Sequence, residues 1–121
     1  MEFPQVSPQD YAVPHQLVYA CAHSTPEISR DGLHDRLVRV DMERGEERVR
    51  SVGKGGYTTE PIVVPKRHGK GVWVLSLIYD SVRHTSFLAI FDGYSVAQEP
   101  IAKLFFPEVV PFTFHGSWRN T

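Results

Sequence analysis

Residues 71–80 decide the fold, because they read Gly-Val-Trp-Val-Leu-Ser-Leu-Ile-Tyr-Asp and are apolar almost throughout. Valine, isoleucine and aromatic side chains favour strands. An apolar run without polar alternation predicts a strand that is covered on both faces. Other parts of the chain must therefore pack against both faces of this strand.

The rest of the chain also consists mainly of predicted strands. Strands are predicted at residues 17–22, 36–41, 46–52, 61–64, 72–79, 85–91, 101–106 and 112–118. Residues 95–98 are expected to form a single turn, and no longer stretch shows the periodicity of a helix. The fold class is therefore all-β, with strands in two groups, 17–52 and 61–106. This spacing suits a sandwich, a barrel or propeller blades.

Composition excludes several classes of protein. The 121 residues carry 13 Lys and Arg against 14 Asp and Glu. Cations are not in surplus to neutralise phosphates, which argues against a nucleic-acid partner. The lone Cys21 excludes an internal disulfide and fits a reducing cytoplasm. There is no signal-peptide pattern, and no apolar run approaches the ~20 residues of a membrane span.

A small basic cluster, Lys66–Lys70, lies between two predicted strands. We expect a solvated hairpin loop. The alternative is a weak peripheral contact with an anionic membrane, where each cation contributes about 1 kcal/mol.

The six histidines do not cluster, and none pairs at the spacing of a local zinc site. Surface positions in polar turns are expected for His15, His34, His68 and His84. His23 ends a strand and is left open. His115 differs, because it lies among the bulky apolar residues of segment 110–118. Its surroundings fit either a buried structural histidine or a metal ligand or catalyst.

Two glutamates, Glu60 and Glu2, stand directly before apolar residues. A carboxylate in such a place costs free energy unless it is paired. One interpretation is an exposed strand end. The other is a carboxylate that accepts a hydrogen bond from a histidine, fixes its tautomer and leaves its other ring nitrogen free for a metal.

Three segments carry a family resemblance: Glu2-Phe3-Pro4-Gln5-Val6, the Glu-Pro-apolar segment 59–65, and segment 110–118 with its Phe-His-Gly. With these motifs in this order, the chain resembles the C-terminal part of the carotenoid cleavage oxygenases. That family includes apocarotenoid and lignostilbene dioxygenases and the retinal pigment epithelium isomerase. The resemblance implies that residues 1–121 are a single C-terminal segment whose antiparallel strands form about two blades of a seven-bladed β-propeller.

The resemblance also implies a ferrous iron held by four histidines, three of which are oriented by glutamates. His115 matches the last ligand, and Glu60 matches the glutamate that orients it. Glu2 matches a second such glutamate, whose histidine would lie upstream. Imidazole suits ferrous iron as a ligand. Phe112 and Phe114 are expected to pack between blades or line a substrate passage.

The implied reaction is the oxidative cleavage of a carbon–carbon double bond in an apolar carotenoid, apocarotenoid or stilbene, with O₂ as co-substrate. Isomerase-type chemistry on the same scaffold stays open. Three histidine ligands would lie before Met1, so this chain alone is expected to be an inactive fragment of the dioxygenase. One alternative is a stand-alone β module for binding or assembly without iron chemistry. Another is an unrelated small β-barrel with an apolar ligand. Open strand edges further predict self-association.

Overall fold

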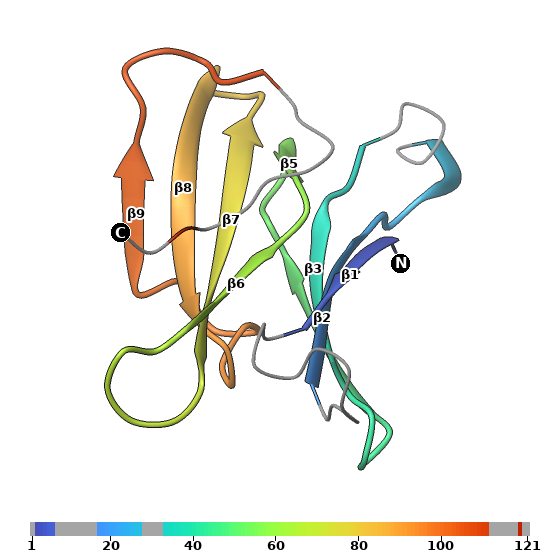
Figure 1. Ribbon diagram of the computed structural model, residues 1–121. Helices are drawn as coiled ribbons and strands as arrows, with labels where there is room; N and C mark the ends of the chain where they lie inside the picture. Colours follow the sequence, from blue (N-terminus) through green and yellow to red (C-terminus); the bar gives the residue numbers. More distant parts are fainter. Residues whose placement is uncertain (1, 7–16, 28–32, 112–118, 120–121) are drawn as a thin grey trace.

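The computed structural model describes residues 2–6, 17–27, 33–111 and 119 (Figure 1). The strands in these ranges are β1 (Glu2–Gln5), β2 (Leu17–Ala22), β3 (Arg36–Asp41), β4 (Glu46–Ser51), β5 (Gly56–Thr58), β6 (Ile62–Pro65), β7 (Val72–Asp80), β8 (Thr85–Asp92) and β9 (Ala102–Phe105). The all-β prediction is confirmed. Within the same ranges, no helix is long and apolar enough to cross a membrane.

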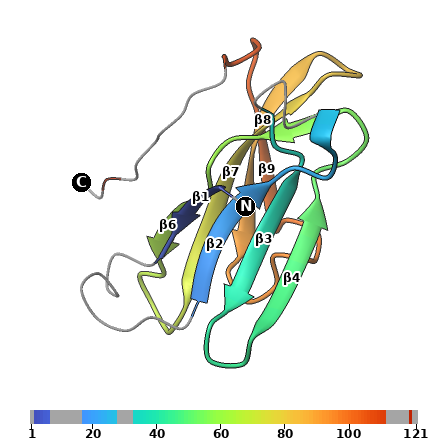
Figure 2. The ribbon, with the colours of Figure 1, turned by 90° about the vertical axis from the view of Figure 1, so that its right-hand side faces the viewer.

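The strands form two antiparallel sheets. The first has the order β1-β2-β3-β4, and the second has the order β5-β7-β8-β9, with β6 also paired to β7. The two sheets lie face to face, with β1 and β6 toward the same side of the molecule in Figure 2. Both sheets are open among the described strands, so the barrel alternative is wrong.

Strand β7 is the centre of the second sheet, as its apolar sequence predicted. It pairs with β8 along one side and with β5 and β6 along the other. Successive residues point to opposite faces, and both Val74 and Leu75 are buried, at 1% and 6% exposed. Both faces of β7 are therefore covered.

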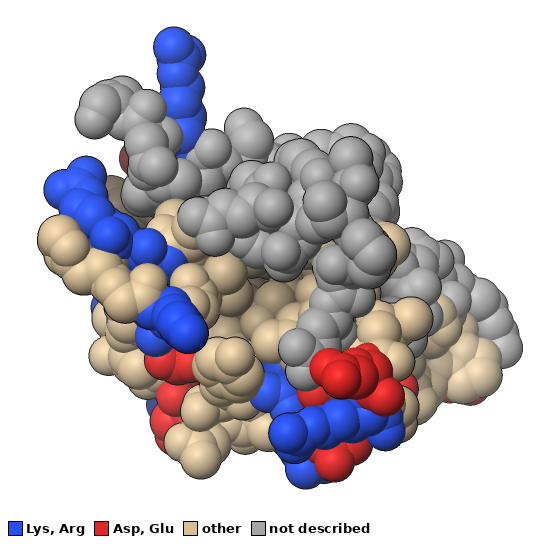
Figure 3. Space-filling model, turned by 60° about the horizontal axis from the view of Figure 1, so that its bottom comes forward, with Lys and Arg blue, Asp and Glu red and all other residues tan. Residues whose placement is uncertain are grey.

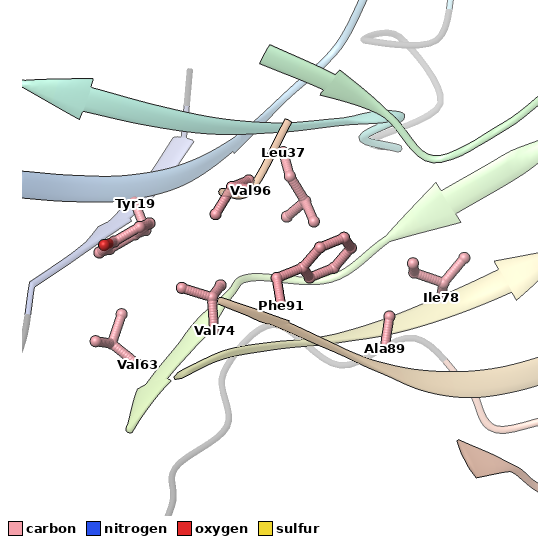
Figure 4. Packing of buried hydrophobic residues seen from close by; sticks show 8 residues of the cluster. All are labelled: Tyr19, Leu37, Val63, Val74, Ile78, Ala89, Phe91 and Val96. Carbon is pink, nitrogen blue, oxygen red and sulfur yellow. The ribbon is translucent and has the colours of Figure 1, made fainter. Parts of the chain in front are cut away.

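One hydrophobic core joins the two sheets (Figure 4). Its buried members are Tyr19 and Leu37 of the first sheet, Val63, Val74, Ile78, Ala89 and Phe91 of the second, and Val96 from the segment after β8. Phe91 is 1% exposed, and the Arg50 guanidinium lies 5.7 Å from its ring centroid. Each sheet therefore depends on the other to cover its inner face.

Polar contacts fix the segment after β8 to the first sheet. The Tyr19 hydroxyl donates a hydrogen bond to the Gly93 carbonyl at 3.0 Å. Arg39 donates from Nη1 to the Tyr94 carbonyl at 2.8 Å. The predicted turn at residues 95–98 is confirmed by a 2.9 Å hydrogen bond from the Gln98 amide to the Ser95 carbonyl.

Two short strands were not predicted. Strand β1 contains a proline and β5 begins with a glycine, residue types that are depleted in strands. Both strands are formed by pairing with longer neighbours, β2 and β7. The predicted strand at 112–118 lies outside the described residues.

The surface prediction is wrong for His34, which is 8% exposed. Its polar surroundings suggested a solvated turn. Instead, its carbonyl accepts a 2.7 Å hydrogen bond from the Thr58 amide, so the segment runs between the two sheets. The ring centroids of His34 and His23 lie 6.2 Å apart. The surface prediction is confirmed for His68 and His84, which are exposed, while His15 lies outside the described part of the chain.

Candidate functional site

Glu60 lies at the junction of the two sheets, between β5 and β6, and is only 5% exposed. Gln5 of β1 directs its Nε2 donor toward Glu60 Oε2 at 3.5 Å. Two residues that are 55 positions apart in the sequence therefore meet across the two sheets, on the side of the molecule where Figure 2 shows both β1 and β6. The interpretation of Glu60 as an exposed strand end is wrong.

The segment that carries Glu60 is held tightly against β7. The Thr59 amide donates to the Leu77 carbonyl at 3.1 Å, and the Thr58 hydroxyl donates to the Thr59 carbonyl at 3.0 Å. Thr58 and Ser76 are both buried, and their hydroxyls share a short hydrogen bond. This hydroxyl pair was missed in the sequence, because neither residue stands out in its own strand. It fixes the backbone from which the Glu60 carboxylate projects.

The structure describes little or nothing of the other predicted site residues. Glu2 lies in β1 opposite Cys21, so its backbone shares the edge that holds Glu60. The Glu2 side chain is not among the described ones. His115, Phe112 and Phe114 fall in segment 112–118, outside the described residues. Their roles stay predictions.

The described residues do not make an iron site by themselves. Among residues 2–6, 17–27, 33–111 and 119, no three His, Cys, Asp or Glu side chains come together in a way that could hold a metal ion. Any iron site must therefore draw on residues beyond these ranges.

The basic hairpin between β6 and β7 is confirmed as a loop, with Arg67–Lys70 exposed. Lys66 is different, because its ammonium lies 2.7 Å from Asp92 Oδ2 and 4.2 Å from the centroid of the Trp73 ring. On the face shown in Figure 3, basic side chains lie beside acidic ones instead of forming one continuous basic surface. The hydrogen bond from Lys66 and that from the Tyr94 amide lower the pKa of Asp92 below its ordinary value of 3.8.

Asp92 is expected to make the chain acid-sensitive. A carboxyl whose folded pKa is lowered stabilises the fold above its unfolded pKa, and this contribution is lost as the pH falls through the folded value. The free energy of unfolding should therefore drop as the pH falls below about 4. In Asp92→Asn this drop should be smaller, whereas Glu47→Gln on the exposed β4 should leave it unchanged. Urea unfolding at a series of pH values measures the drop, and equal drops in all three proteins would contradict this assignment.

Comparison with known proteins identifies the family. The family model described as Retinal pigment epithelial membrane protein matches residues 1–120. The chain belongs to this family of carotenoid oxygenases. The carotenoid oxygenase structures that it matches are β-propellers, which confirms the fold that the motifs implied.

Individual carotenoid oxygenases match over nearly the whole chain. The apocarotenoid-15,15'-oxygenase of Synechocystis is 37% identical over 125 residues, which cover 99% of this chain and 25% of that protein. A chloroplastic carotenoid cleavage dioxygenase 7 from Oryza sativa subsp. japonica is 32% identical over 128 residues, which cover 98% of this chain and 20% of that protein. The structure of cobalt-substituted Synechocystis apocarotenoid oxygenase has a TM-score of 0.87 and 36% identity, covering 99% of this chain and 25% of that one. The chain thus spans about a quarter or less of the length of these relatives.

Proposed function

We propose that this chain is the C-terminal part of a non-haem Fe(II) dioxygenase that cleaves a carbon–carbon double bond in an apolar conjugated substrate with O₂. The observation that carries the proposal is the buried Glu60 carboxylate at the edge shared by β1 and β6. Orienting a metal-bound histidine is one established use of a buried carboxylate. Membership of the carotenoid oxygenase family supports a carotenoid or apocarotenoid as substrate, with a stilbene as the second class.

In this proposal the chain contributes one ligand and two orienting groups. His115 would bind the iron through one ring nitrogen, and Glu60 would accept a hydrogen bond from the other. Glu2 would do the same for a histidine elsewhere in the enzyme, while Phe112 and Phe114 would line the substrate passage. The iron, when bound, would supply the centre at which O₂ reacts. The ties from Thr58 and Thr59 to β7 would keep the Glu60 carboxylate from turning away.

The proposal assigns no activity to the 121 residues alone. A single imidazole leaves most of the coordination of a ferrous ion to water, and the described residues add no cluster of ligands. The remaining ligands are expected from other blades of the propeller. Activity is therefore expected only of the assembled enzyme, in which this chain would supply His115, Glu60 and Glu2.

A chimera tests the proposal. In the Synechocystis apocarotenoid oxygenase, the quarter that matches this chain is replaced by residues 1–121. We expect the chimera to cleave an apocarotenoid into two carbonyl products, whereas the 121-residue chain alone forms none. Product analysis by liquid chromatography and mass spectrometry, with a stilbene as second substrate, measures the outcome.

The matched control is the same chimera with His115→Ala, which should fold like the parent but lose cleavage. A chimera that folds and binds iron yet cleaves neither substrate would contradict the proposal and favour a binding or assembly module. Cleavage that persists in His115→Ala would contradict the role given to this histidine.

A further inference from the structure

Gln5 of β1 contacts the buried Glu60 carboxylate from the opposite sheet. Its Nε2 group donates toward Glu60 Oε2 at 3.5 Å, and the Gln5 side chain is half-buried. An ionised carboxylate can only accept hydrogen bonds, so the Gln5 amide has to turn its NH₂ group toward it. Gln5 has no part in the function proposed above, although it meets the very group on which that function depends.

An irregularity in β1 brings Gln5 to this position. Glu2 pairs with Cys21 and Gln5 pairs with Tyr19, so three residue steps along β1 are matched by two along β2. Strand β1 therefore contains an extra residue, which makes a β-bulge. Residues that stand directly opposite each other in an antiparallel pair share a face of the sheet. Because Tyr19 faces the core between the two sheets (Figure 4), Gln5 faces the second sheet as well.

The bulge decides which way Gln5 points. If the register set at Glu2 continued without it, Gln5 would pair with Val18, on the opposite face of the sheet. Pro4 suits this irregular place, since proline has no amide hydrogen and occurs in sheets at edge strands and bulges. Strand β1 is the edge strand of its sheet. Bulges that re-aim a side chain are frequent next to functional sites.

The other ties of this segment act on its backbone. The Thr59 amide bonds the Leu77 carbonyl, and the Thr58 hydroxyl bonds the Thr59 carbonyl. These bonds do not by themselves set the rotation of the Glu60 carboxylate, because the last torsion of a glutamate has only broad preferences. A carboxylate that orients a histidine has to present an oxygen in one direction. Gln5 contacts the carboxylate itself and can therefore fix that direction.

We propose that Gln5 is a positioning residue, whose amide holds Oε2 of Glu60 and so directs the carboxylate toward the histidine ligand. This role rests on the function proposed above, in which Glu60 orients His115. Gln5 comes from the first sheet, whereas the Glu60 backbone is tied to β7 of the second. The direction of the carboxylate therefore depends on how the two sheets pack together.

Metal affinity of the chimera tests this role. Gln5→Met removes the amide and keeps a flexible, unbranched side chain. We expect it to lower the affinity by about three- to tenfold. The loss should be smaller than that caused by removing the carboxylate, because 3.5 Å is a long hydrogen bond. The probe is cobalt(II), which has been substituted into the Synechocystis relative, and its affinity follows from a titration of the metal-free chimera monitored by visible absorption.

A second exchange and a control accompany Gln5→Met. Gln5→Asn keeps the amide but is one carbon shorter, so its donor falls short of Glu60 and the affinity should drop as much. Gln98→Met makes the same exchange at an exposed glutamine and should leave the affinity unchanged. Urea unfolding shows which variants are folded.

A double-mutant cycle separates a positioning role from a purely structural tie between the sheets. Glu60→Met removes the carboxylate, and the double variant replaces both partners by apolar side chains, an exchange that can be nearly neutral for stability. If Gln5 acts through Glu60, Gln5→Met should change the cobalt affinity by no more than about twofold in the Glu60→Met background.

Three results would overturn the proposal, and they differ in what they say of the proposed function. Equal losses from Gln5→Met in both backgrounds would mean that Gln5 supports the fold and does not act through the carboxylate. An unchanged affinity in folded Gln5→Met, together with a loss in Glu60→Met, would remove the role of Gln5 and leave the proposed function intact. If neither single exchange lowers the affinity, Glu60 orients no ligand, and the role of Gln5 falls with it.

Discussion

A Glu60→Gln exchange in the chimera is expected to lower iron affinity and cleavage by about 10–100-fold, the usual cost of losing a carboxylate that orients a metal-bound histidine. The amide has the same shape but no charge, so it supports the imidazole less well. The fold should survive, because glutamine can keep the contact with Gln5 and fill the same buried space. Iron content after dialysis against a chelator, followed by steady-state cleavage rates, measures both effects.

The control for Glu60 is a carboxylate of equal charge outside the junction. Glu47→Gln on the exposed β4 should change neither iron content nor rate. Glu60→Asp should fall between the parent and Glu60→Gln, because it keeps the charge and shortens its reach. If Glu60→Gln retains full iron and full activity, Glu60 does not orient a ligand.

A Phe91→Ala exchange is expected to destabilise the chain by about 3–5 kcal/mol, the range for truncating a fully buried phenylalanine. The ring is 1% exposed and lies in the core between the two sheets (Figure 4). Its loss opens a cavity that the strand pairing on both sides of β8 prevents from collapsing. Urea unfolding monitored by tryptophan fluorescence gives the change in the free energy of unfolding.

Tyr94→Ala serves as the comparison for Phe91, since it removes an aromatic ring that is 65% exposed. We expect it to change stability by no more than about 0.5 kcal/mol, as for most surface substitutions. Equal effects of the two exchanges would mean that the sheets do not share the core described above.

The sequence was sufficient to predict the long strands and their division into two groups. Strand β7 could be predicted because its apolar run needs cover on both faces, and this signal is local. Strands β1 and β5 could not be predicted, because they exist only through pairing with β2 and β7. The burial of His34 could not be predicted for a related reason, since its segment contacts the other sheet, where the Thr58 amide donates a hydrogen bond to the His34 carbonyl.

The candidate site, too, could be predicted from the sequence only in part. The motif around Glu60 indicated that a carboxylate stood before an apolar strand, but left open whether it was exposed. Its burial follows from the meeting of β1 with the start of β6, which no local pattern encodes. The Thr58–Ser76 hydroxyl pair that steadies this segment likewise arises from the pairing geometry of β7. The roles of His115 and Glu2 rest on the motifs that match the family.

Iron stoichiometry tests most directly the claim that this chain supplies one ligand to an iron site completed by other blades. Metal analysis by mass spectrometry is carried out on the purified 121-residue chain, the chimera and the chimera with His115→Ala. The account predicts close to one iron per chimera, and little or none in the chain alone or in the folded His115→Ala variant. Tight stoichiometric iron in the 121-residue chain, or full iron in the His115→Ala chimera, would contradict it.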